Sequence, residues 1–72
     1  MEELVFIVTP EDDGGYSAAC ALPDGLIATQ GDNWPDLEAM VRDAVACHFG
    51  KDAPKKVRLR LMKESVLSLA TA

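Results

Sequence analysis

Residues 14–32, GGYSAACALPDGLIATQGD, join two turn signals to two short apolar segments. Residues 16–22 alternate larger side chains with small ones, which predicts a strand. Residues 23–25 (Pro-Asp-Gly) predict a tight turn, because proline restricts φ and glycine tolerates positive φ, and residues 26–30 return as a strand. The stretch therefore predicts an antiparallel hairpin. One face of its first strand holds only small residues, which suit close approach by a helix or another subunit: Ser17, Ala19 and Ala21.

A further apolar segment precedes this hairpin. Residues 4–9 (LVFIVT) form a continuous run rich in β-branched and aromatic side chains. This pattern is typical of a strand that is covered on both faces or central in its sheet. Pro10 cannot donate a ladder hydrogen bond, and residues 11–15 add charges and two glycines. We therefore expect a hairpin turn between residues 4–9 and residues 16–22.

The residues after the hairpin predict one helix. Asn33 can cap its first turn through the side-chain oxygen, and Pro35 fits that turn because its missing N–H costs nothing there. Asp36 has the capping-box spacing from Asn33 and complements the positive end of the helix dipole. Gly50 can end the helix. Apolar residues recur at spacings of three and four, which predicts one buried stripe: Trp34, Leu37, Met40, Val41, Ala44, Val45 and His48.

Residues 56–61 (KVRLRL) alternate basic with apolar side chains, which predicts a fourth strand with one buried face. The order β-β-β-α-β predicts an α+β fold. We expect an antiparallel three-stranded meander, one helix packed on the sheet, and a fourth strand returned parallel to the first. The other sheet face then needs a cover. Residues 66–69 (VLSL) extend this strand or form a separate arm, and their pattern does not distinguish strand from helix.

Composition places the chain among compact soluble domains. Its 72 residues are near the lower limit for one core, so we expect a single domain over residues 1–72 that gains stability from self-association or a partner. No apolar run approaches the roughly 18–20 residues that cross a bilayer. Residues 1–3 lack the basic stretch of a secretory signal, so we expect a cytoplasmic location and no membrane contact. Cys20 and Cys47 form no close pair, which predicts two buried reduced thiols, no metal site and no cofactor.

Charge is distributed unevenly along the chain. Residues 1–50 hold ten acids and one base, net −9, whereas residues 51–72 hold six bases and two acids, net +4, so the formal charge is −5. An acidic surface repels phosphates and favours a basic protein partner. The basic segment leaves nucleic acid as the less favoured partner.

The sequence contains no catalytic motif. Neither GxSxG nor HExxH occurs, and no phosphate loop precedes the helix, so we expect no enzyme activity. His48 is the only candidate general base, and we interpret it as structural because a protonated imidazole complements a helix C-terminus. A hydrolase or sensor built around His48 is a third hypothesis, which requires that ring to lie in a cleft beside a carboxylate. We interpret Trp34 as packing the helix on the sheet rather than anchoring a partner.

Residues 14–45 resemble the core of HicB-like antitoxins. The family pattern is a Gly-Gly-Tyr turn, a Leu-Pro-Gly-like turn, a threonine or serine followed by Gln-Gly-Asp, and a Glu/Leu-rich helix. Residues 47–67 resemble short stand-alone members, which consist of the core domain alone. The matching residues fall within residues 5–49 and are Gly15, Tyr16, Ala18, Leu22, Pro23, Gly25, Thr29, Gln30, Gly31, Asp32, Leu37, Glu38, Val41 and Ala44.

This resemblance implies a partial ribonuclease H-like fold, in agreement with the element order above. It also implies a role in neutralising a small basic mRNA-cleaving toxin of the HicA type. Longer members carry a C-terminal helix-turn-helix or ribbon-helix-helix domain for operator DNA, and we expect no such DNA-binding domain and no autorepression here. Nuclease activity is not implied, because metal-dependent cleavage needs several carboxylates at strand centres and the segments LVFIV and VRLRL offer none.

We therefore expect a non-enzymatic, antitoxin-like binding module. We also expect a homo-oligomer, a dimer or a tetramer, formed through a sheet edge or the uncovered sheet face. The expected partner contacts are exposed acidic turns and one aromatic ring: Glu11, Asp12, Asp13, Tyr16, Asp24 and Asp32. The alternative, a small nucleic-acid-binding module, would use basic residues around the fourth strand: Lys55, Lys56, Arg58, Arg60 and Lys63.

Overall fold

The computed structural model describes residues 3–62 together with Leu67 and Leu69. Every strand and helix predicted within residues 3–62 is present, and the bounds differ from expectation by a residue or so at the ends. The expected α+β fold is confirmed. Its elements in chain order are β1 (Glu3–Pro10), β2 (Tyr16–Leu22), β3 (Gly25–Gly31), α1 (Trp34–Phe49), the 3-10 turn η1 (Gly50–Asp52) and β4 (Lys56–Leu61).

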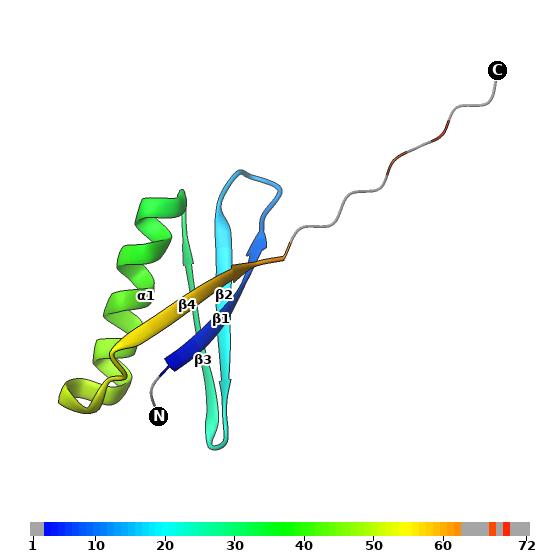
Figure 1. The fold of residues 1–72 in the computed structure, drawn as a ribbon. Coiled ribbons are helices and arrows are strands. Elements are labelled where there is room, and N and C mark those ends of the chain that lie inside the picture. The colour runs from blue at the N-terminus through cyan, green and yellow to red at the C-terminus, as the bar shows by residue number, and fades with distance from the viewer. Residues whose placement is uncertain (1–2, 63–66, 68, 70–72) are drawn as a thin grey trace.

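The four strands form one mixed sheet in the order β3-β2-β1-β4. The pairs β1–β2 and β2–β3 are antiparallel, whereas β4 returns parallel to β1, with Leu4 opposite Val57 and Val8 opposite Leu61. The sheet is twisted, so that β4 runs obliquely across the direction of β3 (Figure 1). The predicted topology, including the parallel fourth strand, is confirmed.

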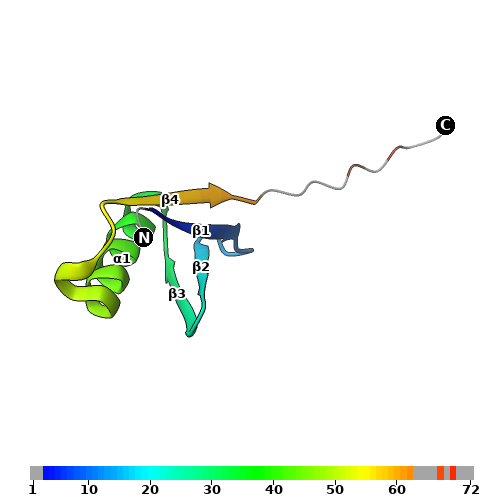
Figure 2. The same ribbon diagram turned by 60° about the horizontal axis from the view of Figure 1, so that its bottom comes forward.

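Helix α1 covers one face of this sheet and leaves the other face without a covering element in the described part of the chain (Figure 2). It packs mainly over β3 and β2. Its three buried residues, at spacings of four, meet the inward side chains of β1, β2 and β3. Together they make the core: Leu4, Phe6, Val8, Ala18, Cys20, Ile27, Leu37, Val41 and Val45.

Strand β1 is central in the sheet, as its apolar run predicted, but residues 3–62 cover it on one face only. Val5 and Ile7 point away from the helix, and Ile7 is 39% exposed. The small residues on the second face of β2 also lie on this side. Of the two expected alternatives, approach by a helix is wrong, because α1 packs on the opposite face, with Ala18 and Cys20. Approach by another subunit stays a prediction.

The ends of α1 follow the predicted capping chemistry. Asn33 Oδ1 accepts the backbone N–H of Asp36 at 2.9 Å, and Asp36 Oδ2 accepts the N–H of Asp32 at 2.9 Å. In a capping box, the second bond would go to the N–H of the cap residue, Asn33. Here Asp36 accepts instead from Asp32, the residue before the cap. Gly50 ends the helix with φ 59°, a left-handed value that favours glycine.

Three side chains that the sequence predicted to be buried are exposed. Cys20 is buried as predicted, but Cys47 is exposed, because it lies outside the buried stripe of α1. His48 is exposed and Met40 is 41% exposed, so the buried stripe is narrower than the sequence predicted. The path of residues 66–69 lies largely outside the described residues.

Candidate partner-binding surfaces

The turn between β1 and β2 contains three of the predicted contact residues, Glu11, Asp12 and Asp13. The N–H of Glu11 donates to the oxygen of Gly15 at 2.8 Å, and the N–H of Gly14 donates to the oxygen of Glu11 at 3.1 Å. Gly14 has φ 93°, which favours glycine. Asp13 Oδ1 accepts the N–H of Gly15 at 3.0 Å. The turn therefore presents its acidic side chains from a hydrogen-bonded loop.

The end of β3 and the start of α1 lie beside this turn. Tyr16 pairs with Gly31 in the β2–β3 ladder. Its ring meets Trp34 edge-on, with centroids 5.4 Å apart, so both rings are used in packing the start of the helix on the sheet. This contact supports the interpretation of Trp34 as a packing residue. Tyr16, expected as a partner contact, is half-buried against it.

We name the acidic end as Glu11, Asp12, Asp13, Asp32 and Asp36. Glu11, Asp13 and Asp32 line one small hollow of about 80 Å³. The sequence by itself assigns Asp36 only to the first turn of the helix. Its bond to the N–H of Asp32 is what places it in this cluster. Among residues 3–62, no salt bridge involves any of these carboxylates.

Asp24 does not join the acidic end. It lies in the β2–β3 turn, where Leu22 pairs with Gly25, at the opposite end of the strands from the pairing of Tyr16 with Gly31. The predicted contact set is therefore split into one cluster and one distant residue.

The basic residues of β4 lie on the sheet face opposite the helix. Val57 and Leu59 pack toward the core, so Lys56, Arg58 and Arg60 point the other way. Lys55 is exposed just before the strand. Lys63, the fifth predicted nucleic-acid contact, lies outside the described residues.

One of these cations is already paired. Arg58 Nε donates to Glu3 Oε1, across the parallel β1–β4 pair. This hydrogen bond, followed by the charges of Arg58, Lys56 and Arg60, holds the pKa of Glu3 below its ordinary value, and the same bond raises the pKa of Arg58. Sequence reasoning missed Glu3 because only the strand register brings it to Arg58.

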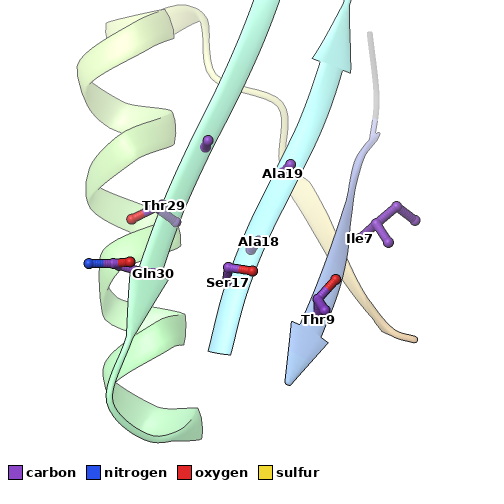
Figure 3. Close-up of a pocket in the computed structure, with 8 residues that line it drawn as sticks. Ile7, Thr9, Ser17, Ala18, Ala19, Thr29 and Gln30 are labelled. Carbon is purple, nitrogen blue, oxygen red and sulfur yellow. The ribbon is translucent and has the colours of Figure 1, made fainter. Parts of the chain in front are cut away.

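The uncovered sheet face, which we name the open face, is formed by alternate residues of all four strands. A shallow hollow of about 490 Å³ lies over β1, β2 and β3 on this face. Figure 3 shows Ile7, Thr9, Ser17 and Ala19 among the lining residues, with the Ile7 side chain extending from β1 and the shorter side chains of Ser17 and Ala19 on β2. The side chains of this face therefore differ in size between β1 and β2.

His48 does not lie in a catalytic arrangement. Its ring contacts Phe49, with centroids 4.7 Å apart, and the hollow it lines between α1 and β3 is formed without a carboxylate. The cleft beside a carboxylate that the third hypothesis requires is not found at this residue. Within residues 3–62, no group of three or more His, Cys, Asp or Glu is placed to hold a metal ion. In the same part of the chain, α1 is too short and too polar to span a bilayer.

Comparison with known proteins gives one strong match. A UPF0150 protein of Thermotoga maritima is 41% identical over 68 residues, and the alignment covers 94% of each chain. No family model matches the sequence, and no solved structure matches it. At this identity over nearly the full length of both chains, this protein is a member of the UPF0150 family.

Proposed function

We propose that this chain is a non-enzymatic, antitoxin-like binding module that neutralises a small basic protein, an mRNA interferase of the HicA type, through its acidic end. One observation carries the proposal. The β1–β2 turn and the start of α1 converge, so that carboxylates separate in sequence gather in one exposed place: Glu11, Asp12, Asp13 and Asp32.

The electrostatics of this surface favour a cationic protein. The first basic residue of the chain is Arg42, so β1 to β3 and the first half of α1 hold no cation that could neutralise the cluster locally. None of these carboxylates forms a salt bridge with another of the described residues, so they create a negative potential that accelerates encounter with a basic partner and disfavours phosphate-bearing ones. The resemblance to HicB-like antitoxins supplies the class of basic partner.

The test is protection of RNA. A purified HicA-type mRNA interferase is mixed with increasing amounts of this protein, RNA cleavage is followed, and the dissociation constant is measured by calorimetry. We expect cleavage to stop near stoichiometric addition. The triple variant E11Q/D12N/D13N should bind about tenfold more weakly, at about 0.5 kcal/mol for each peripheral charge. The amide of the substituted Asp13 keeps an oxygen that accepts the Gly15 N–H, so the turn is preserved.

The matched control is D24N/D43N/D52N. These three carboxylates are exposed and lie outside the acidic end, and their removal changes the net charge by the same amount. The control should bind like the unmodified protein. Equal weakening in both variants would show that binding depends on net charge and not on the acidic end. RNA cleavage that continues when the unmodified protein is added in excess would reject the toxin as partner. A pull-down from native extract, read by mass spectrometry, then identifies what the acidic end does bind.

A second candidate function is nucleic-acid binding by β4. The observation that favours it is that Lys56, Arg58 and Arg60 project at every second residue from one face of an edge strand. Three phosphate contacts with a single strand predict that log K falls with log salt with a slope of about −2. Fluorescence anisotropy of a labelled RNA measures this slope, and no binding at low salt would remove this candidate.

A further inference from the structure

The side chains of the open face differ in size from strand to strand. Its β1 residues are bulky and β-branched, whereas its β2 residues are small. The strand register sets them in level rows: Ile7 lies beside Ala19, and Thr9 lies beside Ser17. The β1–β2 pairing runs from Pro10–Tyr16 to Ile7–Ala19, and Val5 and Ala21 follow on the same two strands beyond it. The face therefore carries a ridge along β1 and a trough along β2.

The rows continue onto the outer strands. In the row that contains Ile7 and Ala19, Ala28 of β3 lies beside Ala19 at one end. Arg60 of β4 lies beside Ile7 at the other end. Further along the strands, Leu26 lies beside Ala21, and Arg58 lies beside Val5. The trough is thus bordered by β3, and the ridge by a basic strand.

We propose that the open face binds a second copy of this chain, about a two-fold axis that runs parallel to the strands between β1 and β2. Rotation about this axis exchanges β1 with β2 and keeps every row at its level. Ile7 of one copy then enters the trough at Ala19 of the second copy, and the reverse contact forms by symmetry. Such a self-complementary contact is what a closed two-fold dimer requires.

Charge selects the same axis. The rotation places β4 of one copy over β3 of the other, so the aliphatic stem of Arg60 covers Ala28 while its guanidinium group reaches the rim. Arg58 keeps its bond to Glu3. A two-fold arrangement with its axis perpendicular to the strands would place β4 on β4 and β1 on β1. Arginines would then oppose arginines, and the ridges would collide while the troughs remained empty. Packing and electrostatics therefore reject that arrangement.

The available area predicts a weak dimer. Four strands at about 4.8 Å and seven residues at about 3.3 Å give about 440 Å² for each face, or about 900 Å² for both. Packed sheets also diverge by about 30°, so contact is closest at the central rows. This area is below that of a standard stable interface, and we expect dissociation in the micromolar range.

The oligomeric state tests the proposal directly. Sedimentation velocity is measured on the full chain from about 1 to about 500 μM, the range in which an interface of this size associates. A reducing agent is included because Cys47 is exposed and could form disulfides. We expect a monomer–dimer equilibrium that A19D abolishes, since it places a charge in the trough. The control A46D makes the same substitution on an exposed position of α1 and should dimerise normally.

Exchanging the side-chain sizes at positions 7 and 19 tests the direction of the two-fold axis without adding a charge. A19I should block dimerisation by filling the trough, I7A should weaken it about tenfold or more by removing the ridge, and I7A/A19I should restore it. Circular dichroism and thermal unfolding verify that each variant is folded. A monomer at every concentration, or a dimer that A19D leaves intact, would overturn the open face as the interface. A folded double variant that stays monomeric would overturn the strand-parallel axis.

Discussion

The substitution Gly31→Ala tests the closest contact between the sheet and the helix. A Cβ built on Gly31 would lie 2.5 Å from the backbone nitrogen of Leu37, 2.6 Å from its Cα and 3.0 Å from the carbonyl carbon of Asp36. Carbon atoms pack at about 3.5–4.0 Å, so α1 would have to move away by about 1 Å. All three atoms belong to the helix backbone, so no side-chain rotation relieves the clash.

The magnitude follows from two losses. Overpacking in a rigid place costs about 1–3 kcal/mol. The displacement would also stretch the capping bonds that Asp36 makes with Asn33 and with Asp32, worth about 1 kcal/mol. We expect the free energy of unfolding to fall by about 3 kcal/mol. A domain of this length has a total of about 4–11 kcal/mol, so the variant would lose between about a quarter and about three quarters of it.

Urea unfolding at micromolar protein concentration measures the loss. Trp34 at the helix start reports the local packing by fluorescence, and far-UV circular dichroism reports the whole fold. The control is Gly25→Ala at the other end of β3, where a Cβ meets nothing within 4 Å and φ is not positive. It should change stability by no more than about 1 kcal/mol. Equal stabilities of the two variants would show that the close approach of α1 to β3 does not exist.

Three further predictions concern single groups. Asn33→Ala should lower the free energy of unfolding by about 1 kcal/mol through loss of the cap, measured by urea titration. Arg58 holds the pKa of Glu3 below its ordinary value of 4.5. The ion pair therefore stabilises the fold above about pH 4.5, and this stabilisation is lost as the pH falls through the lowered pKa that Glu3 has in the folded state. Urea midpoints of the unmodified protein and E3Q should therefore differ at pH 7 and converge in acid, and a constant difference would contradict the ion pair. Cys47 should react with a thiol reagent at once and buried Cys20 only on opening of the fold, so equal rates would contradict the burial of Cys20.

Much of the fold could be predicted from the sequence because its determinants are local. Proline and glycine mark the turns, Asn33 and Gly50 mark the helix ends, and alternation marks the strands. Part of the acidic end could be predicted as well, because Glu11, Asp12, Asp13 and Asp32 lie in turns, whereas Asp36 joins it through its bond to the Asp32 N–H. Each of these signals acts through a few neighbouring residues, whose backbone preferences do not depend on the rest of the chain.

Other features required the assembled sheet. In β2, Ala18 and Ala19 are the same residue type, and alternation alone did not say which of them faces the helix. Asp24 and Asp32 are equivalent acidic turn residues in the sequence, yet the antiparallel ladder separates them by the full length of the strands.

By itself, therefore, the sequence determined the elements, their order, their ends and the sign of the charge on each segment. The tertiary structure decided which face of each strand is covered, which acids meet, and that Glu3 pairs with Arg58 across 55 residues. The physical reason is that these outcomes depend on strand register and on the position of α1 over the sheet. Both arise from packing between residues far apart in the chain, and local preferences carry no information about them.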